Sequence, residues 1–339
     1  MRFQITSIVS AALLLTACGG GSSSSTTIVD NNNSGSNTGS SQSITLNFTP
    51  KSFGENIDCS SVITGFGLDG QDTVQMQDLR FYVSDVVVTS SNGQSESLAL
   101  VSNEFQYADE TGSVSLIDFT DVVTGYCAQS SSGTARTNSQ ITGTTTLSDV
   151  AQVDFTIGVP QAMMKEITAS YTTEDAPTPL NEMFWSWASG YRHFVFNFGV
   201  LNAASDEGSG AVHIGSRNCV DAAATALADK ESCEFVNNPQ ISLSNFNPST
   251  DVITVNLDAL FNGVSFVQEV SSESDHMSMD MSSDEMSMTG TTRPGVSCHS
   301  APAESQPDCA PIFNNFGLSL SDGTANAANN SVFQFETAY

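Results

Sequence analysis

The chain has 339 residues, with 37 Asp and Glu against nine Lys and Arg, and a formal net charge of −28. A surface this acidic repels nucleic acids and anionic lipid headgroups, and it attracts metal cations or basic partners. The sequence contains no phosphate-binding loop, dinucleotide-binding fingerprint, His-Glu-x-x-His zinc helix or Gly-x-Ser-x-Gly nucleophile elbow.

The N-terminus has the features of a bacterial lipoprotein signal. Arg2 supplies a short basic region, and residues 8–15 form an apolar stretch too short to cross a bilayer. The following Leu15-Thr16-Ala17-Cys18 matches a lipobox, so residues 1–18 predict a signal peptide with Cys18 as the lipidated residue; an ordinary signal peptide is the alternative. Gly19 in place of Asp favours the outer membrane, with the domain facing the periplasm or the cell surface.

Residues 19–43 are almost entirely Gly, Ser, Thr and Asn, which predicts a flexible tether. Residues 44–339 then predict one all-β domain, a β-sandwich with disulfide-stapled loops and few short helices, because many short apolar runs are separated by Gly, Asn and Ser clusters. Strands are expected at 43–48, 79–88, 96–101, 113–118, 139–147, 151–158, 192–200, 211–215, 239–245, 252–257 and 331–337. Short helices are expected at 221–229 and 310–316.

Six of the seven cysteines remain once Cys18 is set aside. An even number in an exported chain indicates three disulfides. Proximity in the sequence favours Cys219–Cys233 and Cys298–Cys309, which leaves Cys59–Cys127. Copper ligation by thiolates is the alternative, but an oxidising compartment disfavours it.

The segment 268–297 is rich in Met, Asp and Ser. Thioethers that alternate with hydrated residues do not build a core, and a soft ligand repeated on a polar loop suits Cu(I). Its acids fit Cu(II) or Ca²⁺ better, and the alternatives are an acidic loop with incidental methionines or a sacrificial oxidant trap. The candidate donors are His276, Met277, Met279, Met281, Met286 and Met288, to which His299 adds a nitrogen if the loop folds back.

Several motifs occur in a fixed order over roughly residues 44–320, and together they resemble the MbnP-like family of periplasmic copper-binding proteins. The most distinctive are Met183-Phe184-Trp185-Ser186-Trp187 with Gly190-Tyr191, and Val212-His213-Ile214-Gly215-Ser216. Others are Asp78-Leu79-Arg80-Phe81-Tyr82, Phe155-Thr156-Ile157-Gly158-Val159-Pro160 and Asp308-Cys309-Ala310-Pro311. Two positions depart from the family pattern: Met163-Met164-Lys165 stands where a histidine is common, and Arg192-His193 replaces Lys-Phe.

The resemblance implies an extracytoplasmic β-sandwich that binds copper and has no turnover of its own. It implies a partner of the MbnH type, a dihaem protein related to cytochrome c peroxidases, and a tryptophan oxidised to kynurenine that joins the copper site. Trp185 and Trp187 are the only tryptophans of the chain, so one of them is the candidate for this modification. By spacing alone both are ordinary core residues.

His213 and His193 are the candidate ligands of the principal site. If 192–200 and 211–215 form a hairpin, the two imidazoles share a face only when the numbers of paired residues sum to an even value. Imidazole nitrogens suit copper, with Cu(I) favoured over Cu(II) here. For each histidine the alternative is a hydrogen-bonded, half-buried residue.

The sequence therefore predicts a non-enzymatic copper-binding lipoprotein for copper capture or transport. One alternative is a surface adhesion or carbohydrate-binding module that uses Ca²⁺ with its acids. Another is a redox substrate whose function is to be oxidised by the haem partner. Hydrolase activity is the least favoured, since four histidines offer few general bases.

Overall fold

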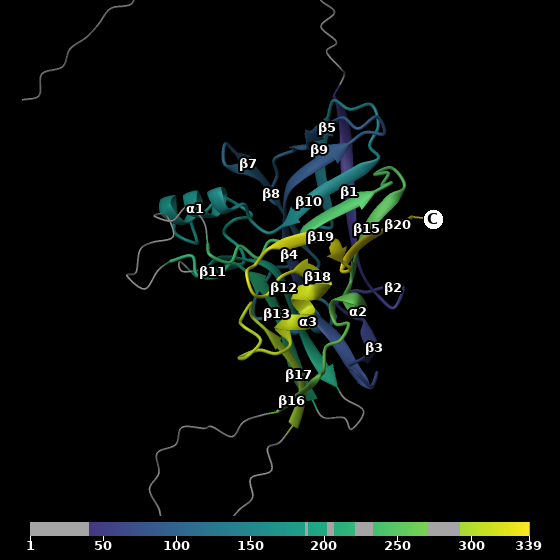
Figure 1. Cartoon of the computed structure of the whole chain (residues 1–339), viewed down its shortest axis with the longest axis vertical. Helices are drawn as coiled ribbons and strands as arrows, with labels where there is room; N and C mark the ends of the chain where they lie inside the picture. The colour runs from purple at the N-terminus through teal and green to yellow at the C-terminus, as the bar shows by residue number, and fades with distance from the viewer. Residues whose placement is uncertain (1–40, 187–188, 202–206, 221–232, 270–291, 339) are drawn as a thin grey trace, which may run out of the picture. The chain divides into compact units, whose positions relative to one another are not determined.

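The computed structural model describes residues 41–186, 189–201, 207–220, 233–269 and 292–338 (Figure 1). Its larger sheet, with twelve strands in the described residues, is organised around one long strand, β4 (Asp72–Thr89). Residues 79–88 of β4 contain consecutive apolar residues, most of them β-branched or aromatic, which suits a strand packed on both faces. The order along the sheet is β14 (Gln240–Ser244), β10 (Gln152–Ile157), β4, β12 (Gly190–Leu201), β13 (Glu207–Gly215), β17 (Thr292–Cys298) and β16 (Val267–Glu269).

Shorter strands extend the edges of this sheet. β3 (Val62–Phe66), β5 (Ser95–Ser97) and β8 (Gly112–Asp118) pair with β4, β7 (Gln106–Asp109) pairs with β8, and β11 (Phe184–Ser186) pairs with β12. The second sheet has the order β20 (Phe333–Thr337), β15 (Asp251–Asn256), β1 (Gln42–Ser52), β9 (Gln140–Thr145) and β6 (Ala99–Leu100), and β2 (Glu55–Asn56) pairs with the end of β1. A separate pair joins β18 (Phe316–Leu318) to β19 (Ala325–Asn330).

The main core lies between the two large sheets. β1 alternates strictly, with Leu46 and Phe48 turned inward, because successive side chains of a strand point to opposite faces. Phe48 meets Phe81 of β4 edge to face, with 6.0 Å between the ring centroids. A second apolar cluster, with Tyr82 and Val195 among its members, packs on the opposite face of the larger sheet. The domain is thus a sandwich with an additional layer outside its larger sheet.

Helix α1 (Gln161–Ser170) supplies that outer layer, burying Met163, Met164 and Ile167. This helix begins directly after Pro160, whose fixed φ suits a helix start. The remaining short helices are α2 (Leu257–Leu260), α3 (Cys309–Asn315) and the 3₁₀ turn η1 (Gly125–Gln129). No helix among the described residues is long and apolar enough to cross a membrane.

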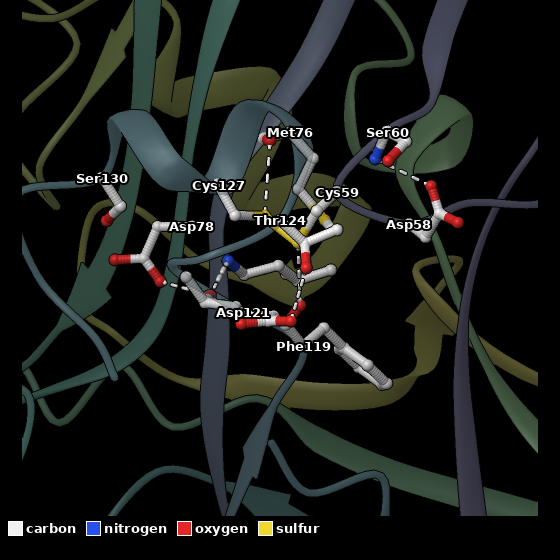
Figure 2. The surroundings of a disulfide bond; sticks show 12 residues. Asp58, Cys59, Ser60, Met76, Asp78, Phe119, Asp121, Thr124, Cys127 and Ser130 are labelled. Atoms are coloured by element: carbon white, nitrogen blue, oxygen red, sulfur yellow. Dashed lines mark hydrogen bonds between the residues drawn. A yellow bond between two sulfur atoms is a disulfide. The ribbon is translucent and has the colours of Figure 1, made fainter. Parts of the chain in front are cut away.

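All three predicted disulfides are present: Cys59–Cys127, Cys219–Cys233 and Cys298–Cys309. Figure 2 shows the first, which ties the loop before β3 to η1. The sulfur of Cys127 lies 3.7 Å from the carbonyl oxygen of Met76 on β4, so this bridge anchors the loop to the central strand.

The all-β prediction is confirmed, and each predicted strand has a counterpart in the described residues. The helix expected at 310–316 corresponds to α3, while the one expected at 221–229 lies outside the described residues. Helix α1 was missed, because ten residues with three buried apolar positions give only a weak helical period.

Candidate metal centre

The β12–β13 hairpin positions the candidate histidines through a change of register. Its paired residues sum to 408 from Phe194–Ile214 through Val195–His213 and onward, an even value. With that register alone, His193 would pair with Gly215 and share the face of His213. A β-bulge between Arg192 and Phe194 instead pairs Arg192 with Gly215. The extra residue turns Arg192, rather than His193, onto the His213 face.

His193 is therefore held by the surrounding backbone and not by the other histidines. It is fully buried, and its Nδ1 accepts a hydrogen bond from the Val159 N–H at 3.4 Å. Its Nε2 lies 3.0 Å from Ser216 Oγ and 3.2 Å from the Val236 carbonyl oxygen. Burial lowers the pKa of His193 to about 4, so the ring is neutral at pH 7. Both ring nitrogens already have partners within the fold.

His213 faces a second histidine. The Nδ1 atoms of His213 and His299 are 2.9 Å apart, with ring centroids at 4.6 Å and planes at 71°. His299 directly follows β17, which runs parallel to β13 with Val212 opposite Cys298. Since the next residue along each strand points to the other face, this register sets the two imidazoles side by side. The structure thus pairs His299 with His213.

Neighbouring groups fix the orientation of both rings. Asn197 Oδ1 accepts a hydrogen bond from the Nε2–H of His213 at 2.7 Å, which leaves Nδ1 of that ring with its lone pair toward His299. Ser300 Oγ accepts from the Gly215 N–H at 2.9 Å and donates to the His213 carbonyl oxygen at 3.0 Å. The backbone N–H of His299 donates to Gln306 Oε1 at 2.6 Å. The pair is therefore held in a rigid backbone frame.

Both rings are neutral at physiological pH. Burial, and then the neighbouring His299, Arg192 and Arg80, lower the pKa of His213 to about 3. Burial and Arg192 also lower the pKa of His299. Because metal ions bind neutral imidazole, no proton has to be removed from a cation before either ring becomes a ligand. Because Asn197 holds the proton of His213 on Nε2, the Nδ1–H of His299 donates to the Nδ1 lone pair of His213.

Trp185 lies next to this pair. Its ring centroid is 6.4 Å from that of His213, and the two planes are nearly perpendicular at 87°. The indole packs on the backbone of Gly215, where an added Cβ would come within 2.9 Å of Trp185 Cε3. Glycine at position 215 is thus what lets the indole approach the histidine strand. The structure therefore brings Trp185, one of the two tryptophans proposed for the site, next to His213.

Several candidates fall outside the described residues. These are Cys18, Trp187 and the donors of the methionine-rich segment, His276, Met277, Met279, Met281, Met286 and Met288. Among the residues that the structure describes, no group of three or more His, Cys, Asp or Glu is placed to hold a metal ion. The described part of the centre is accordingly a pair of imidazoles beside an indole.

Sequence reasoning missed the residues that support the pair. Asn197 carried a detectable signal, because it lies two residues from Val195 on the same face of a strand expected to pair with that of His213. Arg192 and Ser300 gave none: the first depends on the bulge, and the second on the parallel pairing of β13 with β17.

Comparison with known proteins identifies the family of this chain and a solved structure of similar fold. A family model described as MbnP matches residues 41–280. The solved structure of MbnP from Methylosinus trichosporium matches with a TM-score of 0.61 and 22% identity, covering 88% of this chain and 99% of that chain. That identity supports a shared fold only. No curated protein sequence matches the chain. His299 lies beyond the range of the family model.

Proposed function

Since this chain belongs to the MbnP family, we propose that it is an extracytoplasmic copper-binding protein whose principal site is the His213–His299 pair. The observation that carries the proposal is the 2.9 Å contact between two neutral imidazole Nδ1 atoms. A shift of the His299 proton from Nδ1 to Nε2, with a small separation of the two rings, would free both Nδ1 lone pairs as nitrogen ligands for one ion without net loss of a proton. The proposed activity is copper binding, without turnover.

Charge favours the monovalent ion. Arg192 and Arg80 act on His213 as positive charges and oppose any further positive charge there. This repulsion is smaller for Cu(I) than for Cu(II) or Zn²⁺. Two nitrogen donors with few hard oxygen ligands also suit the softer ion. Cu(I) is therefore the form of copper that this centre best accommodates.

Trp185 is the proposed site of oxidation to kynurenine by an MbnH-like dihaem partner. The haem partner would remove four electrons from the indole while two oxygen atoms, from water or a peroxide, add at C2 and C3 and the C2–C3 bond breaks. Hydrolysis by a further water molecule would then release C2 as formate and leave kynurenine. Kynurenine carries a carbonyl and an aromatic amine, which are new donors beside His213. A modified Trp185 would lie beside His213, whose ring centroid is 6.4 Å from that of the indole.

The cellular setting follows from the disulfides and the N-terminus. Three disulfides suit an oxidising compartment. With Cys18 lipidated and residues 19–43 as a tether, the domain would be anchored at the outer membrane and face the periplasm or the cell surface. His276 and the methionines of 268–297 would then form a second, weaker site that harvests Cu(I), for capture or transport.

Metal analysis of the purified protein tests the principal site. Wild-type protein from copper-fed cells should retain about one copper per chain against a mild Cu(I) chelator, whereas His213→Asn and His299→Asn should each lose it. His193→Gln is the matched control, since it replaces a buried histidine whose partners are backbone and serine groups. Equal copper retention by all three variants would refute the site.

Two further measurements separate the other parts of the proposal. Intact mass of native protein, with peptide mapping of Trp185, shows whether the indole has been oxidised. Deletion of 273–289 should lower copper loading at limiting copper while leaving the tightly held ion in place. A protein that loses its tightly held ion on this deletion would assign the principal site to the methionine-rich segment instead.

A further inference from the structure

A cavity far from the histidine pair has the features of a peptide-binding slot. Its volume is about 540 Å³, and it lies between the turn and strand at 52–57, which includes β2, and the segment 61–65, which forms most of β3. These two walls are consecutive in the sequence. The loop that joins them, residues 58–60, is anchored by the Cys59–Cys127 disulfide, as Figure 2 shows. The loop between the two walls is therefore covalently linked to η1, which contacts the central strand β4.

One wall of the slot is an unpaired strand edge. Within the described part of the chain, β3 pairs only with β4, through Val62–Gln75, Ile63–Val74 and Thr64–Thr73. Its other edge faces the cavity. An exposed edge of this kind offers backbone N–H and C=O groups to an added strand. Val62 and Thr64 are exposed and Ile63 is buried, so an added strand would have the side chains of the first two beside it on the exposed face.

A buried hydroxyl on the opposite wall has no partner. Ser52 is only 2% exposed and lines the cavity, and its Oγ makes no hydrogen bond among the described residues. An unsatisfied buried hydroxyl costs folding free energy, and a group bound in the slot would lower this cost by supplying the missing bond. A strand lying in the slot would present such backbone groups to it.

The remaining lining determines what would fit. Phe53 is 55% exposed, and its ring lies over Gly65, where an added Cβ would be 3.3 Å from the ring. Glu55 lines the cavity, and Asp58 begins the loop at its end. The lining contains no lysine or arginine. The slot thus combines an aromatic surface with negative charge.

We propose that this slot binds an extended, basic segment of a partner protein by strand addition to β3. Alternate residues of the segment would be apolar, to pack on Phe53 and Val62, and the others would be Lys or Arg, to face Glu55 and Asp58. Backbone pairing supplies affinity, and the alternate side chains supply specificity. The site is independent of copper binding at His213.

The probe is a fluorescein-labelled peptide, Lys-Val-Lys-Phe-Lys-Val-Lys, titrated with the full-length, oxidised protein and followed by fluorescence anisotropy. Saturable one-to-one binding is expected. The same peptide with Glu in place of Lys tests charge. A version methylated at the backbone nitrogens of its third and fifth residues tests strand pairing at unchanged charge, since methylation removes the N–H that a ladder needs. Neither control peptide should bind.

Ser52→Ala separates a binding role from a structural one. Removal of the orphan hydroxyl should raise the melting temperature of the free protein while weakening the basic peptide about tenfold. If the Ser52 hydroxyl bound no ligand, the melting temperature would rise but the peptide affinity would not change. Ser52→Ala with unchanged peptide affinity would therefore overturn the proposal.

Charge reversal gives a second, matched pair of variants. Glu55→Lys should weaken the basic peptide at least about tenfold, whereas Glu110→Lys, the same change in the turn between β7 and β8, should leave it unchanged. β3 pairs with residues 72–75 of β4 and β8 with residues 80–84, so the control is remote from the slot. Equal losses in both variants, or equal binding of the acidic peptide, would show non-specific attraction and refute the site.

Discussion

The surroundings of His193 and of His213 differ, although both residues lie on one hairpin and both have a strongly lowered pKa. Each ring nitrogen of His193 meets backbone or serine groups that belong to the fold. His213 uses one nitrogen on Asn197 and turns the other toward His299. Burial and a lowered pKa therefore do not identify a metal ligand; the decisive feature is a neighbour that can donate a second lone pair.

The largest expected effect concerns the stability contribution of His193. Its replacement by alanine removes a fully buried ring and leaves the Val159 N–H without an acceptor, so the free energy of unfolding should fall by about 3 kcal/mol. Copper affinity of the folded fraction should not change. Denaturant titration together with Cu(I) competition measures both quantities, and a fall in affinity would remove the distinction between the two histidines.

Gly215→Ala tests the surroundings of His213, where the indole of Trp185 packs on the Gly215 backbone. The added Cβ would lie 2.9 Å from both the indole of Trp185 and the carbonyl oxygen of Tyr191, so the indole must move. A loss of about 2 kcal/mol and a shifted tryptophan emission are expected. Gly199→Ala, on the same hairpin, meets only glutamine side-chain atoms at 3.4 Å or more and serves as the control. Identical spectra for both variants would contradict the packing of Trp185 at this site.

Asn197 tests whether orientation of His213 matters for binding. Asn197→Ala removes the acceptor that fixes the His213 tautomer and should lower Cu(I) affinity about tenfold, or about 1.4 kcal/mol. Asn197→Asp keeps an acceptor oxygen and should restore most of the affinity. If alanine and aspartate behave alike in Cu(I) competition, the hydrogen bond does not support the centre.

The smallest expected effect is the change in folding stability with pH that results from protonation of His193. Its pKa is about 4 in the fold and near 6.5 in the unfolded chain, so the unfolded chain binds an extra proton between these values. Stability is complete above about pH 6.5 and falls toward pH 4, by at most about 1.4 kcal/mol per pH unit. His193→Gln should lack this contribution.

The difference between wild type and His193→Gln, measured by denaturant titration at several pH values, isolates the histidine. Burial raises the pKa of Asp118 to about 7, so this carboxyl has the opposite sign: its protonated form is favoured in the fold, and it lowers stability as pH rises toward 7. That contribution is common to both proteins and cancels. A pH-independent difference would contradict the neutral, buried state of His193.

Local patterns in the sequence were sufficient to predict the strands, the disulfides and the family of this protein. Alternation predicted strands such as β1, because burial of one face needs a period of two. Cysteine spacing predicted all three disulfides, since nearby cysteines in an exported chain meet most readily. Ordered motifs indicated the MbnP family, and they suggested a site with His213 and one of the two tryptophans, Trp185 or Trp187.

Only the tertiary structure decided which histidine joins His213. One additional residue at the Arg192–Phe194 bulge reverses the face of everything before it, and this removes His193 from the shared surface. The parallel pairing of β13 with β17 brings in His299, which is 86 positions away in the chain. Bulges and long-range strand pairings depend on the packing of the whole sheet, and no local pattern of residue types encodes them.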